Sequence, residues 1–221
     1  MNQPRITVIH TSPATIELFG RLIAEQLPQA RVSNILDDSI LPQLRDNGGR
    51  VEEIAPRWRQ YARIARDGGA QVILNACSSI GELCAPVARE LGIPIVRVDA
   101  AMAREAVGRG ERIAVAATLR STLRPTCDLL VQTAQAQGRA VAVEARLADG
   151  AYEALIAGDR DGHDDRVAAA LADAARDCGV VVLAQASMAR VLPRLTPQQQ
   201  NKCLVSPPLA VASVVEAVRQ L

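Results

Sequence analysis

The chain has 221 residues, 49% of them hydrophobic and 22% charged, with 25 basic and 24 acidic side chains and a formal net charge of +1. This balance is typical of a folded globular protein of one large or two small domains, and it excludes a largely disordered chain. Without a strong net charge there is no global field to hold a polyanion, so neither nucleic acid nor a membrane surface is an expected partner.

Short β-rich segments alternate with longer helix-like segments along the chain, which predicts an α/β fold of parallel strands covered by helices. An apolar stripe over residues 51–65 predicts a helix that ends at Gly68-Gly69. Another helix is expected from about Ser79 to Leu91. The predicted strands are Ile6–His10, Arg31–Leu36, Gln71–Leu74, Ile95–Val98, Ile113–Ala116, Ala140–Ala145 and Val180–Ala184.

An internal repeat relates the two halves of the chain. The motif Arg5-Ile6-x-Val8-x-x-Thr11 recurs, at an offset of 107, as Arg112-Ile113-x-Val115-x-x-Thr118. At an offset of 108 Cys77 falls on Gln185, whereas an offset of 110 would place it on Ser187, so the register there is open. The repeat predicts two α/β lobes, residues 1–98 with 206–221 and residues 99–205. A ligand is expected in the cleft between them, at the carboxyl ends of the strands.

The five cysteines and the chain start indicate a cytoplasmic protein. An odd number of widely spaced cysteines in a chain of this length favours reduced thiols, and no Cys and His ligands cluster as a metal site requires. No apolar run approaches the roughly 20 residues that span a bilayer, and Met1–Arg5 lacks the pattern of a signal peptide. Cys84 is expected on the apolar face of its helix, Cys127 in a helix, Cys178 before a strand and Cys203 in a polar loop.

Cys77 is the thiol with a distinctive setting, within Asn75-Ala76-Cys77-Ser78-Ser79 between an apolar strand and a predicted helix. Free backbone N–H groups and the positive end of a helix dipole are expected to lower its pKa. The alternative is that Cys77 is a small buried hydrophobic residue, although its polar neighbours weigh against an apolar pocket. Cys77 is therefore the candidate catalytic residue.

Hydroxyl-rich turns follow strands in both halves of the chain. Singly, each hydroxyl is explained as a helix cap, but together such residues could surround a carboxylate with N–H and O–H donors around Cys77. The motif Gly108-Arg109-Gly110 lacks the third glycine of a dinucleotide loop, so NAD is not expected. The candidate substrate-binding residues are Ser12, Asn75, Ser78, Ser79, Thr118, Ser121, Thr122, Gln185 and Ser187.

Five stretches, in this order along the chain, carry a family resemblance: Ile6–Thr15, Leu74–Ser79, Ile93–Ala103, Arg112–Thr122 and Val182–Met188. The sequence resembles the aspartate/glutamate racemase superfamily, which includes hydantoin racemase, arylmalonate decarboxylase and maleate isomerase. The resemblance implies a cofactor-independent isomerase of two pseudo-symmetric α/β lobes, each a short parallel sheet flanked by helices, with the active site in the interlobe cleft. It also implies a small carboxylate substrate and two cysteines that act on opposite faces of the carbon next to the carboxylate.

Only one of the two family cysteines is present. Cys77 matches the first, and Ala184-Gln185-Ala186 stands where the family commonly has Gly-Cys-Thr or Gly-Cys-Ala. Three hypotheses follow: a racemase or isomerase with Cys77 as its single acid/base, a decarboxylase or lyase of a malonate-like acid, and a small-carboxylate binding protein without turnover. Nucleophilic addition by Cys77 is a further alternative. The substrate and the oligomeric state stay open, with a homo-oligomer among the alternatives.

Overall fold

The computed structural model describes residues 3–221, so Met1 and Asn2 of the segment considered for a signal peptide lie outside the described residues. The chain divides into two compact units. Unit 1 comprises the described residues through Asp99 together with Pro207–Leu221, and unit 2 comprises Ala100–Ser206. The expected boundaries, after residue 98 and before residue 206, lie one residue from these.

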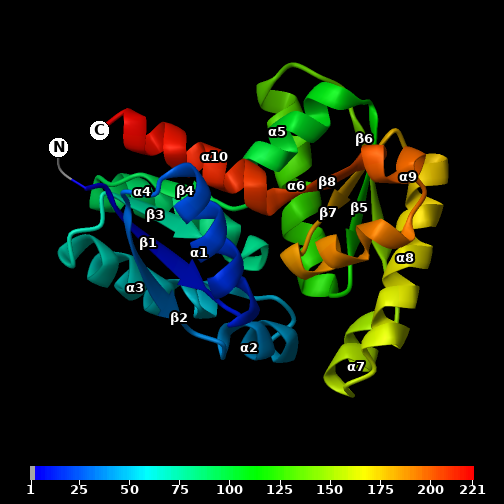
Figure 1. Ribbon diagram of the computed structural model, residues 1–221, viewed down its shortest axis with the longest axis horizontal. Helices are drawn as coiled ribbons and strands as arrows, with labels where there is room; N and C mark the ends of the chain where they lie inside the picture. Colours follow the sequence, from blue (N-terminus) through cyan, green and yellow to red (C-terminus); the bar gives the residue numbers. More distant parts are fainter. Residues whose placement is uncertain (1–2) are drawn as a thin grey trace. The chain divides into compact units, whose positions relative to one another are not determined.

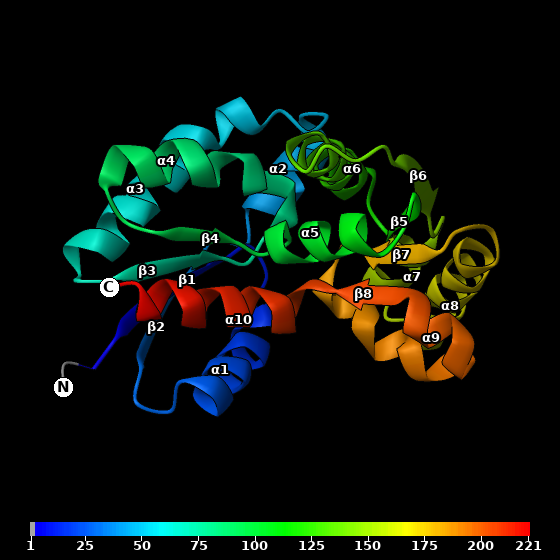
Figure 2. The same ribbon diagram turned by 90° about the horizontal axis from the view of Figure 1, so that it is seen from above.

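Unit 1 contains a sheet of four parallel strands in the order β2-β1-β3-β4. Figure 2 shows α3 and α4 on one side of this sheet and α1 and α10 on the other. The strands are β1 (Arg5–His10), β2 (Arg31–Leu36), β3 (Val72–Asn75) and β4 (Ile95–Arg97). The helices are α1 (Ala14–Gln26), α2 (Ile40–Asp46), η1 (Val51–Glu53), α3 (Ala55–Asp67), η2 (Ser78–Leu83), α4 (Cys84–Leu91) and α10 (Ser206–Arg219), where η marks a 3₁₀ helix.

Two apolar clusters include side chains of the sheet of unit 1, one cluster on each face. Because alternate side chains of a strand point to opposite faces, Ile9 packs in one cluster with Trp58 of α3. Ile6 and Val8 pack in the other cluster with Phe19 of α1 and with α10. A strand covered on both faces is apolar throughout, which explains the unbroken aliphatic runs in the sequence.

Unit 2 contains a second sheet of four parallel strands, in the order β6-β5-β7-β8. Ala114 and Ala116 of β5 pack in a cluster with Leu171 of α8, whereas α5 contacts β7 and α6 contacts β5. In Figure 1, α8 lies on one side of this sheet and α5 and α6 lie on the other. The strands are β5 (Arg112–Ala117), β6 (Ala142–Leu147), β7 (Val180–Leu183) and β8 (Cys203–Val205). The helices are α5 (Ala100–Arg109), α6 (Arg120–Ala136), α7 (Ala151–Ile156), α8 (Arg160–Asp177), η3 (Ala186–Arg194) and α9 (Pro197–Lys202).

The strand registers of the two sheets repeat each other. Ile6 pairs with Val72 in unit 1, and Ile113 pairs with Val180 in unit 2. The first members of the two pairs are related by an offset of 107 and the second members by an offset of 108, as the repeat in the sequence predicts. The segment after the third strand therefore has the offset of 108, so that Cys77 corresponds to Gln185 and not to Ser187.

The structure corrects two expectations about secondary structure. Cys203 does not lie in a polar loop: it begins β8, a strand of three residues that is too short to give a periodic pattern. The α-helix expected from Ser79 begins only at Cys84, and a 3₁₀ segment with a kink at Ile80 precedes it. Pro86 supplies the reason, because a proline is tolerated in the first turn of an α-helix but would break one that had begun at residue 79.

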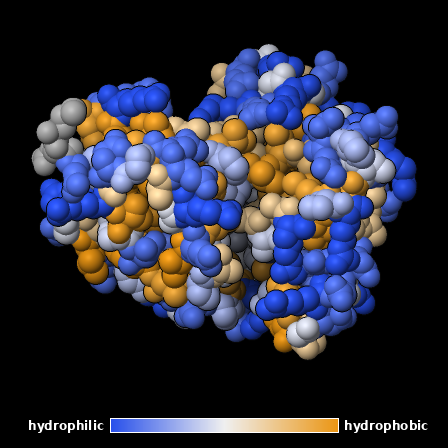
Figure 3. Space-filling view, in the orientation of Figure 1, coloured by the Kyte–Doolittle hydropathy of each residue, from blue (hydrophilic) through white to orange (hydrophobic). Residues whose placement is uncertain are grey.

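Polar and apolar residues are interspersed on the face of the molecule shown in Figure 3. The large hydrophobic side chains that are exposed are Leu36, Ile64, Val131, Ile156 and Leu221. None of the described helices is both long and apolar enough to cross a membrane.

Candidate active site

Cys77 lies just beyond the carboxyl end of β3, where the chain turns into η2. Its side chain is buried, with 6% of its surface exposed. Asn75 Nδ2 donates a hydrogen bond of 2.9 Å to the carbonyl oxygen of Cys77, and Ala76 N donates to Ile9 O at 2.9 Å. These two bonds hold the turn against β1 and fix the position of the thiol.

Several hydrogen-bond donors surround the sulfur of Cys77. They are the hydroxyl of Thr11, the hydroxyl and the backbone N–H of Ser79, and the backbone N–H of Ile80. Each favours the thiolate, but burial outweighs them and raises the pKa of Cys77 above its ordinary value. The expected lowering of this pKa is therefore wrong. A kinked 3₁₀ turn replaces the helix whose dipole was to supply it, and desolvation disfavours the charged form.

The other predicted residues of unit 1 surround this turn. Ser78 and Ser79 are buried at the start of η2, and Asn75 is fully buried with its Oδ1 unpaired within residues 3–221. Ser12 is half-buried, and its carbonyl oxygen accepts a hydrogen bond of 2.9 Å from the hydroxyl of Thr15. Thr15 is in turn 2.7 Å from Nδ1 of His10, whose pKa is lowered by burial. The imidazole of His10 thus supports the turn that carries Thr11 and Ser12.

Thr11 is a functional candidate that the sequence-based set of site residues omits. It directly follows β1 and reaches the sulfur of Cys77 from a neighbouring strand. The signal was present in the sequence, because Thr118 is a predicted site residue and Thr11 is its counterpart in the repeat, at the offset of 107.

In unit 2 Gln185 occupies the position that corresponds to Cys77. Each residue directly precedes a 3₁₀ segment in an extended conformation, with φ −128° and ψ 116° at Cys77 and φ −129° and ψ 131° at Gln185. Thr118 N and Thr118 Oγ1 donate to Gln185 Oε1 at 2.6 Å and 2.9 Å. These bonds occupy the carboxamide oxygen, so the donating Nε2 is the end of the side chain that remains for a ligand.

Equivalent threonines therefore contact equivalent positions in the two units. The structure brings Thr118 together with Gln185, as it brings Thr11 together with Cys77. Thr122 is buried and Ser121 half-buried in the first turn of α6, whereas Ser187 is exposed in η3. Within the described residues, neither serine hydrogen-bonds to Gln185. The convergence of all these residues on Cys77 stays a prediction, as does a site in a cleft between the lobes.

The remaining cysteines have the surroundings of structural thiols. Cys84 packs in the core with Ile80, Val87 and Leu91, and burial raises its pKa to about 12. Burial also raises the pKa of Cys203 to about 11. Across residues 3–221, no three His, Cys, Asp or Glu side chains form a group that could hold a metal ion.

Comparison with known proteins identifies the family of this chain. The model of the Asp/Glu/hydantoin racemase family matches residues 6–215. The chain belongs to this family. No curated protein matches it.

Solved structures of racemases share the fold of this family member. A glutamate racemase from Bacillus anthracis is 15% identical, with a TM-score of 0.77, and the match covers 100% of this chain and 83% of that chain. An aspartate racemase from Picrophilus torridus is 10% identical, with a TM-score of 0.69 and coverage of 98% and 94%. A cysteine-substituted mutant of arylmalonate decarboxylase in a sulfate-associated form is 18% identical, with a TM-score of 0.56 and coverage of 98% and 94%. At these identities the likeness concerns the two-lobe α/β fold.

Proposed function

We propose that this racemase-family protein is a cofactor-independent enzyme that moves a proton at the carbon next to a substrate carboxylate, with Cys77 as its single thiol acid/base. The observation that carries the proposal is the set of donors around the buried sulfur, from Thr11, Ser79 and Ile80. A cysteine that served only as core filler would not require three neighbouring residues to donate hydrogen bonds to it. Membership of the family supports the reaction class, and a small carboxylate is the proposed substrate.

The proposed cycle begins from the thiol, the form that burial favours. Loss of its proton to solvent gives a thiolate that the hydroxyl and N–H donors stabilise, and this thiolate removes the proton next to the carboxylate. The same thiol then returns a proton to the same face of the planar intermediate. The position equivalent to Cys77 in unit 2 holds Gln185, whose carboxamide has no proton to transfer near neutral pH. Exchange of the α-proton with retention of configuration is therefore the expected outcome.

Decarboxylation of a malonate-like acid is the second candidate function. Two features favour it: burial raises the pKa of Cys77, which favours the protonated thiol, and Gln185 stands at the equivalent position of unit 2. Loss of CO2 would leave the electron pair on the adjacent carbon, and the thiol would donate its proton there and become a thiolate. Proton uptake from solvent would restore the thiol. One donor on one face would give a product of a single configuration.

An assay in D2O separates these functions. Aspartate, glutamate, substituted hydantoins and monosubstituted malonates are incubated with the protein, and deuterium uptake, CO2 release and product chirality are measured together. Deuterium uptake with retention supports the proposal, and CO2 release with one enantiomer supports the decarboxylase. Saturable binding of a carboxylate without either reaction would show a binding protein instead.

Two cysteine variants make the assay specific. Cys77→Ala is expected to abolish turnover, whereas Cys84→Ala, which alters a buried core thiol of the same unit, should leave it nearly intact. Fast racemisation that survives Cys77→Ala would overturn the assignment. Fast racemisation that requires Cys77 would show that another group delivers the second proton.

A further inference from the structure

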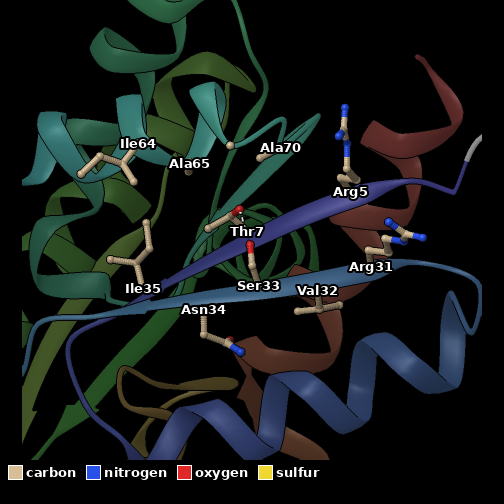
Figure 4. A pocket seen from close by; sticks show the side chains of 11 residues that line it. Arg5, Thr7, Arg31, Val32, Ser33, Asn34, Ile35, Ile64, Ala65 and Ala70 are labelled. Carbon is tan, nitrogen blue, oxygen red and sulfur yellow. Dashed lines mark hydrogen bonds between the residues drawn. The ribbon is translucent and has the colours of Figure 1, made fainter.

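A pocket of about 330 Å³ lies in unit 1, away from the residues of the candidate active site. One wall is formed by β1 and the edge strand β2, and the other by the C-terminal part of α3 and the segment that follows it. Figure 4 shows Arg5, Thr7 and Ser33 on the side of the strands that faces Ile64 and Ala65. The pocket is at the lower end of the size range of small-molecule sites.

Two arginines stand side by side at one end of this pocket. Arg5 and Arg31 are direct partners in the register of β1 and β2, so their side chains leave the same face of the sheet. Like charges placed opposite each other on neighbouring strands repel. Within residues 3–221, neither guanidinium forms an ion pair with a carboxylate. The pair is thus an uncompensated positive site.

Local contacts hold both guanidinium groups at the pocket. Arg31 Nε donates to Gln3 Oε1 at 2.7 Å. The guanidinium of Arg5 lies over Gly69, where a Cβ would come within 2.6 Å of Arg5 Cζ. Gly69 also has a φ of +88°, a backbone conformation that favours glycine.

On this face of the sheet, the side chains of β1 and β2 change along the strands from charged to polar and then to apolar. Thr7 pairs with Ser33, and their hydroxyl oxygens are 2.7 Å apart. Ile35 follows on β2, and Ile64 of α3 lines the pocket with 60% of its surface exposed. An isoleucine that is largely exposed beside a concave surface is available to cover the apolar part of a ligand.

We propose that this pocket binds a small organic oxyanion that carries a short aliphatic chain. Its carboxylate or phosphate head would lie between Arg5 and Arg31, because guanidinium groups match both anions with paired hydrogen bonds. The hydroxyls of Thr7 and Ser33 would contact the head, and the aliphatic chain would lie against Ile35 and Ile64. The proposal is independent of the reaction at Cys77.

Binding is tested on the full chain with four probes. They are 4-methylpentanoate, 3-methylbutyl phosphate, the neutral 4-methylpentanamide and inorganic phosphate. Calorimetry should show saturable binding of one or both organic anions, weakened by added salt, and no binding of the amide. The two organic probes distinguish a carboxylate ligand from a phosphate ligand, and inorganic phosphate measures what the head binds without the chain.

Two variants with matched controls locate the site. Arg31→Gln and Ile64→Asp should each weaken binding by about tenfold or more, because one removes a charge-assisted hydrogen bond and the other adds a repelling carboxylate. The controls are Arg89→Gln, at an exposed arginine of α4, and Ile156→Asp, at an exposed isoleucine of unit 2, and neither should change the affinity. All four positions are exposed, so the variants should fold.

Amide NMR spectra show where the anion binds, independently of the measured affinities. The expected result is that an organic anion shifts the signals of residues 31–35 and 64–70. Shifts confined to residues 76–81 would place the anion at the candidate active site and overturn the proposal. The absence of saturable binding, or equal binding by Arg31→Gln and the native chain, would also overturn it.

Discussion

The contact between Thr11 and Cys77 is the most informative feature at the scale of single residues. A hydroxyl from the end of β1 donates to a sulfur at the end of β3, and the equivalent Thr118 donates to Gln185 in unit 2. Both units thus have a threonine at this position, but its partner is a titratable thiol in unit 1 and a neutral amide in unit 2. If Cys77 is the acid/base of the proposed function, the second residue after β3 or β7 decides whether a unit can carry that chemistry, and a threonine hydroxyl donates to this residue in either unit.

Replacing Thr11 by valine should raise the pKa of Cys77 further, because the thiolate loses a donor. The alkylation profile should therefore move to higher pH, because the lost hydrogen bond favoured the charged form. The measurement is the rate of alkylation by iodoacetamide as a function of pH, followed at Cys77 by mass spectrometry. Thr118→Val is the matched control and should leave this profile unchanged. An unaltered profile in Thr11→Val would show that the hydroxyl does not act on the thiol.

Cys84 should make the protein less stable at alkaline pH. Burial raises its pKa from 9.0 to about 12, so the unfolded chain releases this proton at a lower pH than the folded chain does. The contribution is complete below about pH 9 and is lost as the pH rises toward 12, at about 1.4 kcal/mol per pH unit. Urea unfolding from pH 8 to 11 measures it. Cys84→Ala should give a shallower decline than the native chain, and parallel declines would contradict the shift.

At the scale of elements, η2 shows how a local conformation serves the candidate site. Its kinked start directs backbone N–H groups of Ser79 and Ile80 to the sulfur of Cys77. Behind it lies Arg97, whose Nε is 2.6 Å from Oδ1 of the fully buried Asp99. Because these two donors belong to the kinked 3₁₀ segment, its geometry is part of the candidate site.

Gly81→Ala should disturb η2, because a Cβ at this position would clash with the side chain of Arg97. Arg97 has little freedom to move, since its side chain is only 13% exposed and is paired with Asp99. A loss of about 1–3 kcal/mol in unfolding free energy is expected from this overpacking. Gly20→Ala is the control: it lies inside α1 with open space around it and should stabilise by up to about 1 kcal/mol. Denaturant unfolding of both variants gives the comparison.

The sequence predicted the elements whose pattern is long and apolar. All seven predicted strands are present with ends displaced by two residues at most, because buried parallel strands are runs of aliphatic residues. It missed β8, because the three residues Cys203–Val205 are too few to show a period, and it began at Ser79 an α-helix that starts only at Cys84. Cys77 could be selected from its polar neighbours, but the dominance of desolvation over its donors depends on burial, which no spacing of residues reveals.

At the scale of the whole molecule, the chain builds one α/β arrangement twice. The strand orders β2-β1-β3-β4 and β6-β5-β7-β8 are the same arrangement, and the pairing of β1 with β3 has its counterpart in the pairing of β5 with β7. The two units differ in continuity: unit 2 is one uninterrupted segment, whereas unit 1 combines the N-terminal part with Pro207–Leu221.

Removing α10 should therefore unfold unit 1 selectively. Val211 and Val214 are fully buried in a cluster with Ile6, Val8 and Phe19, so deletion of residues 207–221 exposes that face of the sheet. Amide hydrogen exchange followed by mass spectrometry should show loss of protection in β1–β4 and retained protection in β5–β8. Deletion of residues 220–221 alone is the control. Equal loss in both sheets would show that the units do not fold separately.

The division of unit 1 along the chain bears on the order in which the two units can be completed during synthesis. Domains generally fold in the order in which they leave the ribosome, the N-terminal one first. Here the N-terminal sheet emerges with α1 but without α10 on one of its faces, and all of Ala100–Ser206 is translated before α10 is complete. Unit 2 is thus the first to have its complete sequence. Unit 1, which carries Cys77, therefore receives its last helix only after the whole of unit 2 has been translated.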